Sequence, residues 1–395
     1  MLFLVFTIFV GCSNEKESIN EEQVLNCEGD VILSSQEEIN QFGDLGCIKI
    51  IGNLIIDDNE ENAVFPVIDI VDLLPLKNIT EVTQQISIKN NDALTNLNGF
   101  DNLVSVGNFL ISSNMELTIL NGFSKLSVIE GNIQIDHNDK MLATNGFQSL
   151  EEIKGFFSID FNNLLERVEG FNSVMSVGNN LHIRENPNLI EITGLSNLRT
   201  INEELNISGN VLLNNINGFS ELKTVGDNLR IEQIDISDFN GFKKLTEVKG
   251  NLYIRKAAMR DFSGLENLTK LGGDFYVGKM DNLLSLNGLN GITNLRAVNI
   301  QFNNQLTSLE GLNNLSTVIS TFHIGSNNAL TDISALSSLE SALAGLEFTW
   351  NSSLSDFCPL TTIMENGGVA NNYFNAHENA FNPSSDDMLN GNCSN

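Results

Sequence analysis

The hydrophobic positions of this chain follow a rhythm that neither a helix nor a long strand would produce. Residues 181–201 read LHIRENPNLIEITGLSNLRTI. Apolar side chains stand two residues apart at Leu181 and Ile183, and from Leu189 onward they recur at every third position. An α-helix would repeat its apolar positions about every 3.6 residues and a strand about every 2.0. The segment therefore predicts a short strand followed by tight turns of extended or 3₁₀ backbone.

The same hydrophobic pattern repeats along most of the chain. A glycine followed by phenylalanine or leucine marks each copy, and successive marks are 23 or 24 residues apart. These glycines are Gly99, Gly122, Gly146, Gly170, Gly194, Gly218, Gly241, Gly264, Gly288 and Gly311. Pro75 and Ala335 occupy the glycine position in two further copies, which gives twelve copies between residues 71 and 350. Repeats of this length, each burying an apolar face against its neighbours, predict a solenoid.

Each copy begins with a strand in which two apolar residues flank one variable residue. Because side chains alternate along a strand, the apolar pair faces the interior and the middle residue faces solvent. The glycines are expected at corners, where they permit backbone angles that a β-carbon would forbid. An asparagine follows each strand, and its inward amide can bond backbone groups that the turn leaves unpaired. These asparagines predict a stacked ladder with a structural role: Asn91, Asn114, Asn138, Asn162, Asn186, Asn210, Asn303, Asn327 and Asn351.

Both ends of the repeat array carry a pair of cysteines. The pairs are Cys27 with Cys47 and Cys358 with Cys393. We expect each pair to form a disulfide that staples a cap over an open end of the solenoid, in an oxidising compartment. This organisation gives an N-terminal cap over 27–70, a repeat solenoid over 71–350 and a C-terminal cap over 351–395.

The N-terminal cap is predicted to contain a helix between two strands. Val31 to Leu33 and Leu54 to Ile56 are apolar runs of strand length. Between them, Ser34 or Ser35 precedes two glutamates, which is typical of the start of a capped helix.

The chain opens on an apolar run that fits a signal peptide. The first eleven residues, MLFLVFTIFVG, are too few to span a bilayer. Cys12 follows, and the stretch FVGC resembles the lipobox of bacterial lipoproteins. The resemblance implies a signal peptide over 1–11, a lipid on Cys12, a polar tether over 12–26 and anchoring at the outer surface of the bacterial envelope. A plain signal peptide with an incidental cysteine is the alternative.

The cap and the coils together resemble a known family. The sequence CEGDVILSSQEEINQFGDLGCIKIIGNLII, followed by these repeats, is similar to the receptor L domain, the leucine-rich-repeat-like β-solenoid of growth-factor-receptor ectodomains and of many bacterial surface lipoproteins. The resemblance covers residue 27 to about residue 350. It implies a right-handed β-rich solenoid with a long parallel sheet and an extracellular binding habit. The cysteine-rich modules of those receptors are not found in this sequence, so hormone binding is not implied.

Charge excludes two classes of partner. The chain has 50 acidic and 21 basic residues, which gives a net charge of −29. Proteins that bind nucleic acid need a basic footprint, and so do proteins that dock on anionic membranes through a polybasic patch. Contact with the membrane is therefore expected only through the N-terminal lipid.

The sequence carries no motif for catalysis or metal binding. None of its four histidines has a zinc-motif partner at ligand spacing, so we predict no metal, no cofactor and no enzymatic activity. The acidic run 57–62 could bind calcium through clustered oxygens. It lacks the spaced ligands of a known calcium loop, so a solvated loop is favoured.

The most irregular copies lie in the middle of the chain. Ile234, Ala257 and Met280 replace the ladder asparagine in three successive copies, and residues 226–282 hold nine of the 21 basic residues together with nine acidic ones. Outward strand positions would gather into an aromatic and cationic patch if neighbouring coils align. The predicted ligand-binding residues are His182, Arg184, Arg230, Tyr253, Arg255 and Tyr276. Aromatic faces stack on sugars and arginines grip carboxylates, which favours an acidic glycan or an acidic protein segment; cross-strand packing of exposed residues is the alternative.

These features favour a non-enzymatic cell-surface lipoprotein that binds an extracellular protein or glycan through the sheet face of a solenoid. A polysaccharide-active enzyme built on a β-solenoid is one alternative. A purely structural envelope or adhesion component is the other.

Overall fold

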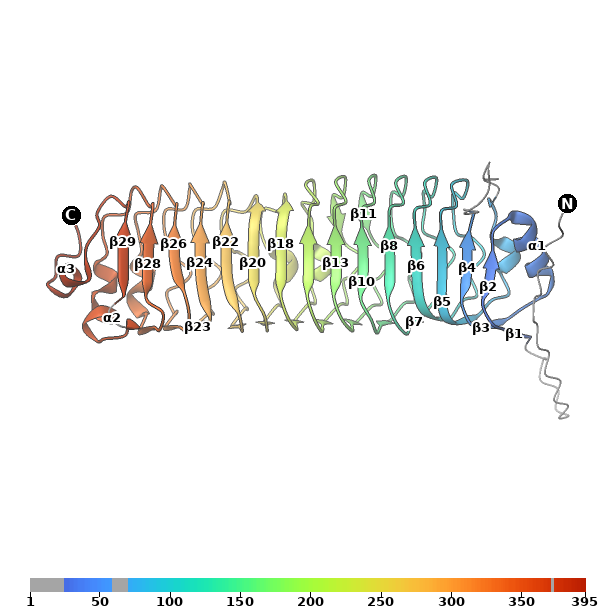
Figure 1. The fold of residues 1–395 in the computed structure, drawn as a ribbon, viewed down its shortest axis with the longest axis horizontal. Coiled ribbons are helices and arrows are strands. Elements are labelled where there is room, and N and C mark those ends of the chain that lie inside the picture. The colour runs from blue at the N-terminus through green and yellow to red at the C-terminus, as the bar shows by residue number, and fades with distance from the viewer. Residues whose placement is uncertain (1–24, 59–69, 371–372) are drawn as a thin grey trace, which may run out of the picture. The chain divides into compact units, whose positions relative to one another are not determined.

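The computed structural model of the protein describes residues 25–58, 70–370 and 373–395 (Figure 1). Within these ranges the chain forms two compact units, unit 1 up to residue 174 and unit 2 from residue 175. The predicted signal peptide, the predicted lipidation site Cys12 and residues 59–62 of the acidic run lie outside the described residues.

Unit 1 is a parallel β-solenoid. In stacking order, the main row of its sheet contains β2 (Val31–Leu33), β4 (Leu54–Asp57), β5 (Glu81–Lys89), β6 (Ser105–Ser112), β8 (Ile133–Asp136) and β10 (Phe157–Asp160). A second row contains β1 (Asn26–Glu28), β3 (Lys49–Ile51), β7 (Val128–Ile129) and β9 (Glu152–Ile153), and the long strands β5 and β6 belong to both rows. The other elements are α1 (Gln36–Asp44), the 3₁₀ turn η1 (Leu74–Leu76) and β11 (Arg167–Val168).

Unit 2 has the same construction. Its main row contains β13 (Leu181–Arg184), β16 (Leu205–Ser208), β18 (Leu229–Ile234), β20 (Leu252–Ala257), β22 (Asp274–Gly278), β24 (Ala297–Gln301), β26 (Phe322–Gly325), β28 (Leu346–Thr349) and β29 (Phe374–His377). Short strands of the second row are β12 (Ser176–Val177), β15 (Thr200–Ile201), β17 (Thr224–Val225), β19 (Glu247–Val248), β21 (Lys270–Leu271), β23 (Asn294–Leu295), β25 (Thr317–Val318) and β27 (Ser341–Ala342). The remaining elements are β14 (Glu191–Ile192), η2 (Asn217–Phe219), η3 (Asn240–Phe242), η4 (Ser334–Ser338), η5 (Cys358–Leu360), α2 (Thr361–Glu365) and α3 (Ser385–Leu389).

The predicted solenoid is confirmed in both units. On β13, Leu181 and Ile183 are fully buried while the side chain of His182 between them is partly exposed. Paired strands keep equivalent residues level, as Leu181 is with Leu205 and Ile183 with Ile207. Because the apolar residues of each coil meet those of the next, the interior is a continuous column of leucine, isoleucine and phenylalanine.

The phenylalanines of the glycine-phenylalanine pairs stack along this column. In unit 1, ring centroids lie 5.6 Å apart for Phe100 and Phe123, 5.3 Å for Phe123 and Phe147, and 4.9 Å for Phe147 and Phe171. All four rings are fully buried. The spacing follows from the separation of neighbouring strands, which is about 4.8 Å.

The glycines of the same pairs are needed chiefly because the coils approach closely. At Gly99, where φ is +134°, an added β-carbon would collide with the carbonyl oxygen of Leu73 on the previous coil. At Gly241, whose φ is not in the left-handed region, a β-carbon would collide with the carbonyl oxygen of Ile216. The predicted need for unusual backbone angles therefore applies only to some corners, whereas the lack of space is common to both.

The predicted asparagine ladder is present and fully buried. Asn114 shows its chemistry: the side-chain nitrogen donates to the backbone oxygen of Ile88 at 3.0 Å and to Oδ1 of Asn138 at 3.1 Å. Its own Oδ1 accepts from the backbone N–H of Asn91 at 3.2 Å. In unit 2 the same bonds join Asn303, Asn327 and Asn351. Each of these amides thus satisfies buried backbone groups of the preceding coil and bonds the amide of the next.

Three coils of unit 2 fill the ladder position without an amide. Ile234, Ala257 and Met280 are buried there, as the sequence predicts. The backbone N–H of Ala257 lies 3.3 Å from the sulfur of Met280, and the N–H of Met280 donates to Oδ1 of Asn303 at 3.1 Å. The methionine sulfur, a weak acceptor, therefore stands where an amide oxygen would be.

A row of left-handed residues precedes the ladder, and the sequence did not reveal it. In twelve coils of the described residues, the residue directly before the ladder position is not glycine and has φ between 52° and 60°. These residues are Asn90, Ser113, His137, Phe161, Glu185, Gln233, Lys256, Lys279, Phe302, Ser326, Trp350 and Glu378. Side chains other than glycine, asparagine and aspartate are costly in this conformation. The surrounding hydrogen bonds impose it, for example the bond from Trp350 N–H to the His377 carbonyl at 3.1 Å.

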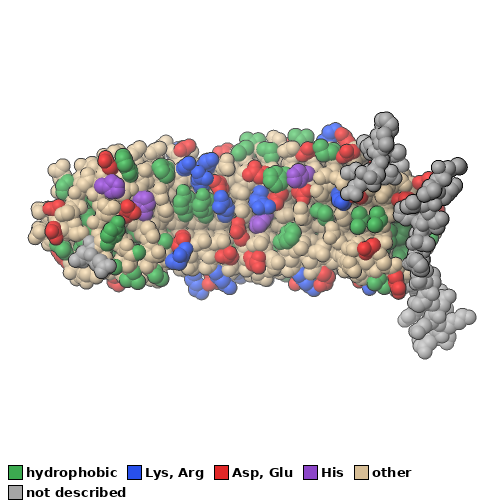
Figure 2. Space-filling view, in the orientation of Figure 1, with side chains coloured by type: hydrophobic (Ala, Val, Ile, Leu, Met, Phe, Trp, Pro, Cys, Tyr) green, Lys and Arg blue, Asp and Glu red, His purple; other side chains and the backbone are tan. Residues whose placement is uncertain are grey.

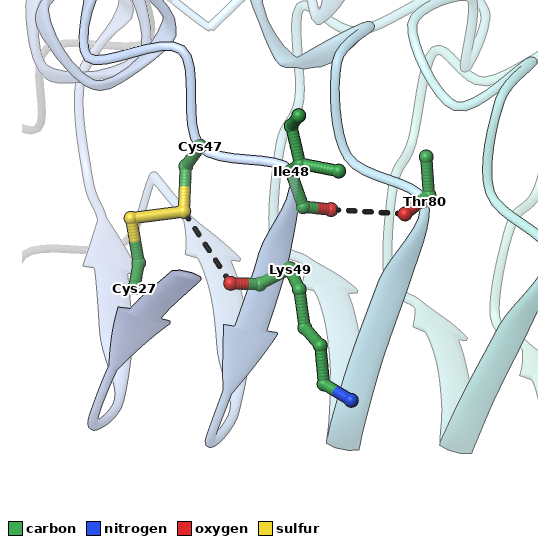
Figure 3. Close-up of a disulfide and its surroundings, with 5 residues drawn as sticks. All are labelled: Cys27, Cys47, Ile48, Lys49 and Thr80. Atoms are coloured by element: carbon green, nitrogen blue, oxygen red, sulfur yellow. Dashed lines mark hydrogen bonds between the residues drawn. A yellow bond between two sulfur atoms is a disulfide. The ribbon is translucent and has the colours of Figure 1, made fainter. Parts of the chain in front are cut away.

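The N-terminal cap of unit 1 has the predicted helix and disulfide. The side chain of Ser35 caps α1 by accepting from the backbone N–H of Glu38 at 3.3 Å. Cys27 on β1 is bonded to Cys47, which lies just before β3 (Figure 3). The bond ties the segment that follows α1 to the first strand of the second row, so the helix is held over the end of the coil.

The C-terminal end of unit 2 carries the second disulfide, between Cys358 and Cys393. The sheet and the ladder also extend one coil past residue 350, where the sequence analysis ends the repeat. β29 pairs in parallel with β28, and Asn351 donates to Oδ1 of Asn379 at 3.0 Å. This last coil separates its asparagines by 28 residues instead of 24, which conceals it from a search at fixed spacing.

Candidate functional site

The outward residues of the main row in unit 2 form two lines across its strands. The first line, in order from β16 to β26, contains Asn206, Arg230, Tyr253, Tyr276, Asn299 and His323. The second line contains Ser208, Glu232, Arg255, Gly278, Gln301 and Gly325. Figure 2 shows hydrophobic and basic side chains side by side on this face, over β18, β20 and β22.

Arg230, Tyr253 and Tyr276 lie on one another as three parallel layers, here called the tyrosine stack. The guanidinium carbon of Arg230 is 4.4 Å from the ring centroid of Tyr253. The rings of Tyr253 and Tyr276 are 4.6 Å apart and inclined by only 7°. Strand spacing sets this distance, so adjacent outward aromatic residues stack without bending the backbone. The predicted alignment of these three residues is therefore present.

Glu232 balances the arginines behind the stack. Its side chain, only 7% exposed, forms ion pairs with Arg230 and, at 2.7 Å, with Arg255. The hydrogen bond with Glu232 raises the pKa of Arg255, and burial raises the pKa of the Tyr276 phenol. Two guanidinium groups thus share one buried carboxylate, which fixes their positions and cancels half of their charge.

A cavity of about 440 Å³ runs beside the stack. Its lining residues come from neighbouring coils of unit 2: Glu204, Asn228, Arg230, Asn251, Tyr253, Asp274, Tyr276, Ala297, Val298, Asn299 and Thr321. Asn228 and Asn251 are held in place because their Oδ1 atoms accept backbone N–H groups of the next coil, at 2.9 Å and 2.7 Å. The volume lies within the range of small-ligand sites, and the lining joins aromatic faces to fixed polar groups.

Two of the predicted site residues lie apart from the stack. His182 is two strands before Arg230, with Asn206 between them, and Arg184 is separated from Glu232 in the same way by Ser208. Neither of the two lines the cavity. The structure therefore brings together Arg230, Tyr253, Arg255 and Tyr276, and places the other two on a more distant part of the sheet face.

Sequence reasoning missed the polar walls of the cavity. Asp274 and Asn299 point outward on β22 and β24, but a polar residue at an outward position is ordinary and gives no signal by itself. The same holds for His323, at an outward position of β26. The usable signal is register: Asn299 follows Tyr276, and His323 follows Asn299, at the spacing of one coil.

The acidic run before the first full coil offers no metal site in the part that the structure describes. Asp57 pairs with Lys89 at 3.0 Å, so its charge is used within the fold. Across the described ranges, no group of three or more histidine, cysteine, aspartate or glutamate side chains is arranged to hold a metal ion. A helix long and apolar enough to cross a bilayer is likewise not found in these ranges.

One family model matches the chain. It is described as the receptor L domain, and it covers residues 223–318, from the start of β17 to the end of β25. No curated protein matches the chain. Domains of this family are typically ligand-binding and non-enzymatic. The stretch matched contains the whole tyrosine stack together with Glu232 and Arg255, so the part of the chain that carries the candidate site is similar to the receptor L domain.

Proposed function

We propose that the protein is an extracellular binding protein that holds a glycan against the tyrosine stack. In this proposal the chain is secreted, lipidated on Cys12 and displayed at the outer surface of a bacterial envelope. The family match supports ligand binding without catalysis. The single observation that carries the glycan is the stack itself, which offers flat aromatic surface beside a cavity of about 440 Å³.

The chemistry around the stack suits sugars better than the apolar core of a protein partner. Sugar rings have apolar faces that pack on aromatic rings and hydroxyl groups that need donors and acceptors around their edge. The cavity supplies amides at Asn228, Asn251 and Asn299 and a carboxylate at Asp274. Protein interfaces instead depend on a central apolar cluster, and the cavity lining has only Ala297 and Val298 as aliphatic members.

Ion pairing changes the preferred ligand from acidic to neutral. The arginines of the predicted patch were expected to grip carboxylates, but Arg230 and Arg255 already hold Glu232, and Arg296 holds Asp274. With Glu204 also on the cavity wall, three positive and three negative side chains surround the site. Because these charges balance one another, a charged ligand gains no net attraction at the site, and a neutral ligand is favoured.

The proposal is tested by binding of oligosaccharides to the mature protein. The probes are neutral hexasaccharides of glucose, mannose and xylose, together with oligogalacturonate and heparin fragments, and calorimetry measures their affinities. We expect a neutral probe to bind, and the double variant Y253A/Y276A to weaken that binding at least tenfold while circular dichroism is unchanged. The chain offers a matched control in Y373A, since Tyr373 is its third tyrosine, is 53% exposed and is not part of the stack.

Three results would overturn the proposal. Equal binding by wild type and Y253A/Y276A would remove the site. Failure of wild type to bind any of the sugars would remove the ligand class and favour a protein partner or a structural role. Release of shortened or unsaturated sugars would make the protein an enzyme.

Anchoring is tested separately, by mass spectrometry of the mature N-terminus in the native host. The expected species begins at Cys12 and carries the mass of a lipid, which the variant C12A lacks. An unlipidated N-terminus at another residue would contradict it.

A further inference from the structure

The tyrosine stack ends abruptly on one side. Tyr253 covers one face of the Tyr276 ring, and among the described residues it is the only ring stacked on Tyr276. The next outward residue of the line is Asn299, whose side chain accepts a hydrogen bond from the Gln301 amide. The two amides are thereby bonded to each other along β24. The second face of Tyr276 thus looks over a low, polar strand.

A second ring stands on the far side of that strand. His323 is level with Asn299 on β26, one coil further on. Its Nε2 lies 3.0 Å from Oγ1 of Thr349, a bond that fixes the imidazole. Burial lowers the pKa of His323, so the ring is neutral near pH 7.

The two rings lean in the same direction, because each lies across a glycine two residues later on its own strand. A β-carbon at Gly278 would be 2.8 Å from the Tyr276 hydroxyl oxygen, and one at Gly325 would be 2.7 Å from Nε2 of His323. Any larger residue at either position would push the ring away. The glycines therefore keep Tyr276 and His323 aligned as two walls on either side of β24.

Strand spacing fixes the width between these walls. Tyr276 and His323 are two coils apart, which corresponds to about 9.6 Å at 4.8 Å per coil. One ring inserted midway would lie about 4.8 Å from each wall, within the range of stacked contacts. A pyranose ring, which is puckered and carries axial hydrogens, fills this space on both faces.

The slot has polar groups where a sugar needs them. Asn299 lies between the two rings on β24. Asn299, Ala297, Asp274 and Thr321 all line the cavity beside the stack. One oxygen of Asp274 holds Arg296.

The geometry points to one specific mode of binding: Tyr276 and His323 sandwich a single pyranose ring of a neutral glycan above Asn299, while the rest of the glycan lies in the cavity beside the stack. This inference rests on the proposed function and adds to it the position of one sugar ring. It also makes His323 a specificity-determining residue, because its wall admits one ring and stops the stack from continuing.

The test fills the slot without touching its walls. In the variant N299Y, the new ring would continue the stack of Tyr253 and Tyr276 at the same spacing and occupy the place of the sugar. The probe is the neutral hexasaccharide that binds wild type most tightly. We expect at least a tenfold loss of affinity, with a melting temperature no lower than that of wild type. The matched control N375Y places the same change on the same line at β29, and should bind as wild type does.

The histidine wall is tested by a pair of variants. H323A removes the wall and should weaken binding about tenfold, whereas H323F restores a flat ring and should recover most of the affinity. The His323 ring resonances of the isotope-labelled protein should shift when the hexasaccharide is added, because a stacked sugar changes their magnetic environment.

The outcomes separate this inference from the proposed function. If Y253A/Y276A loses binding but N299Y and H323A bind normally, the slot is wrong and the glycan site stands. If all these variants bind as wild type does, both are wrong. If N299Y abolishes binding of a tyrosine-containing peptide but wild type binds no sugar, the occupant is an aromatic side chain of a protein partner and the sugar assignment fails.

Discussion

Two kinds of coil in unit 2 fill the ladder position with different side chains. In coils such as those of Asn303 and Asn327, a buried amide bonds the backbone of the preceding coil and the amide of the next. In the three coils from Ile234 to Met280, hydrophobic side chains and one sulfur fill that position. Both kinds keep the left-handed residue before the ladder position and the same strand register. The frame of the solenoid therefore does not depend on an unbroken ladder.

The difference coincides with a difference on the outer face. β18 and β20 are six residues long and pair as far as Ile234 with Ala257, whereas β13 and β16 are four residues long. The tyrosine stack lies on these lengthened strands and on β22. Where the interior amides are missing, the backbone pairing is longer and the face carries the candidate site. The residues that hold the solenoid together and the residues that form its outer surface are therefore different residues of the same strands.

Breaking the ladder in an intact coil should have the largest effect. In the variant N327L, a side chain of similar volume replaces an amide that donates to Ile300 O at 2.9 Å and accepts from Asn303 N–H at 3.0 Å. Two buried backbone groups of the preceding coil lose their partners. We expect the free energy of unfolding to fall by about 3 kcal/mol, since each unsatisfied buried group costs about 1–3 kcal/mol. Urea denaturation followed by circular dichroism measures it.

The conservative control for that experiment is N328A, one residue further on, where the asparagine is exposed. It should change stability by less than about 0.5 kcal/mol, as surface substitutions usually do. An equal loss in N327L and N328A would mean that the ladder amide is not what holds the coil.

The substituted coils should be most sensitive at Glu232. The variant E232Q keeps the shape of the side chain but removes the charge that two arginines share. We expect a loss of about 1–2 kcal/mol in unfolding free energy, because hydrogen bonds to charged groups contribute about 1.5–3 kcal/mol and both arginines are partly exposed. The uncovered positive charge should also allow oligogalacturonate to bind. Unchanged stability together with unchanged sugar preference would show that Glu232 does not set the charge of the site.

Restoring the ladder should have a smaller effect of opposite sign. In M280N the new amide oxygen would accept from Ala257 N–H in place of the sulfur, and Asn303 would continue the chain of amides. A full hydrogen bond replaces a weak one, so we expect a gain of up to about 1 kcal/mol. A loss of more than about 2 kcal/mol would mean that the three coils have no room for amides, and that the substitution in the sequence is a packing requirement. Thermal melting of M280N beside M280L distinguishes the two.

The smallest expected effect is a pH dependence from His323. Burial lowers its pKa in the folded protein, His377 lowers it further and Glu347 opposes them. Since the unfolded chain then binds more protons, the free energy of unfolding should fall as pH drops through the ordinary histidine pKa of about 6.5. The variant H323F should lose part of that slope between pH 7 and pH 5, measured against H137F in unit 1, whose ring side chain is 58% exposed. An identical slope in all three proteins would contradict the assignment.

The sequence was sufficient for the frame because its repeat is nearly constant in length. Equal spacing places Tyr253 level with Tyr276, and alternation sends both outward, so their contact followed from counting. The same counting identified the positions of Ile234, Ala257 and Met280. The cysteine pairs followed from their places at the two ends of the array.

The sequence could not predict the contacts that depend on side-chain rotamers. Glu232 was counted among the acids of the region, but its shared contact with Arg230 and Arg255 depends on rotamers. The alignment of Tyr276 with His323 depends on two glycines outside the repeat signature, Gly278 and Gly325. The coil of Asn379 was missed because its spacing is 28 residues.

The row of left-handed residues offers sites at which substitution by glycine should stabilise the fold. Lys256, Lys279 and Trp350 each hold a backbone conformation that favours glycine by about 1–2 kcal/mol. Glycine is already present at the equivalent position of one coil, Gly209. Exchanging several of the others would raise the melting temperature in steps without touching the interior.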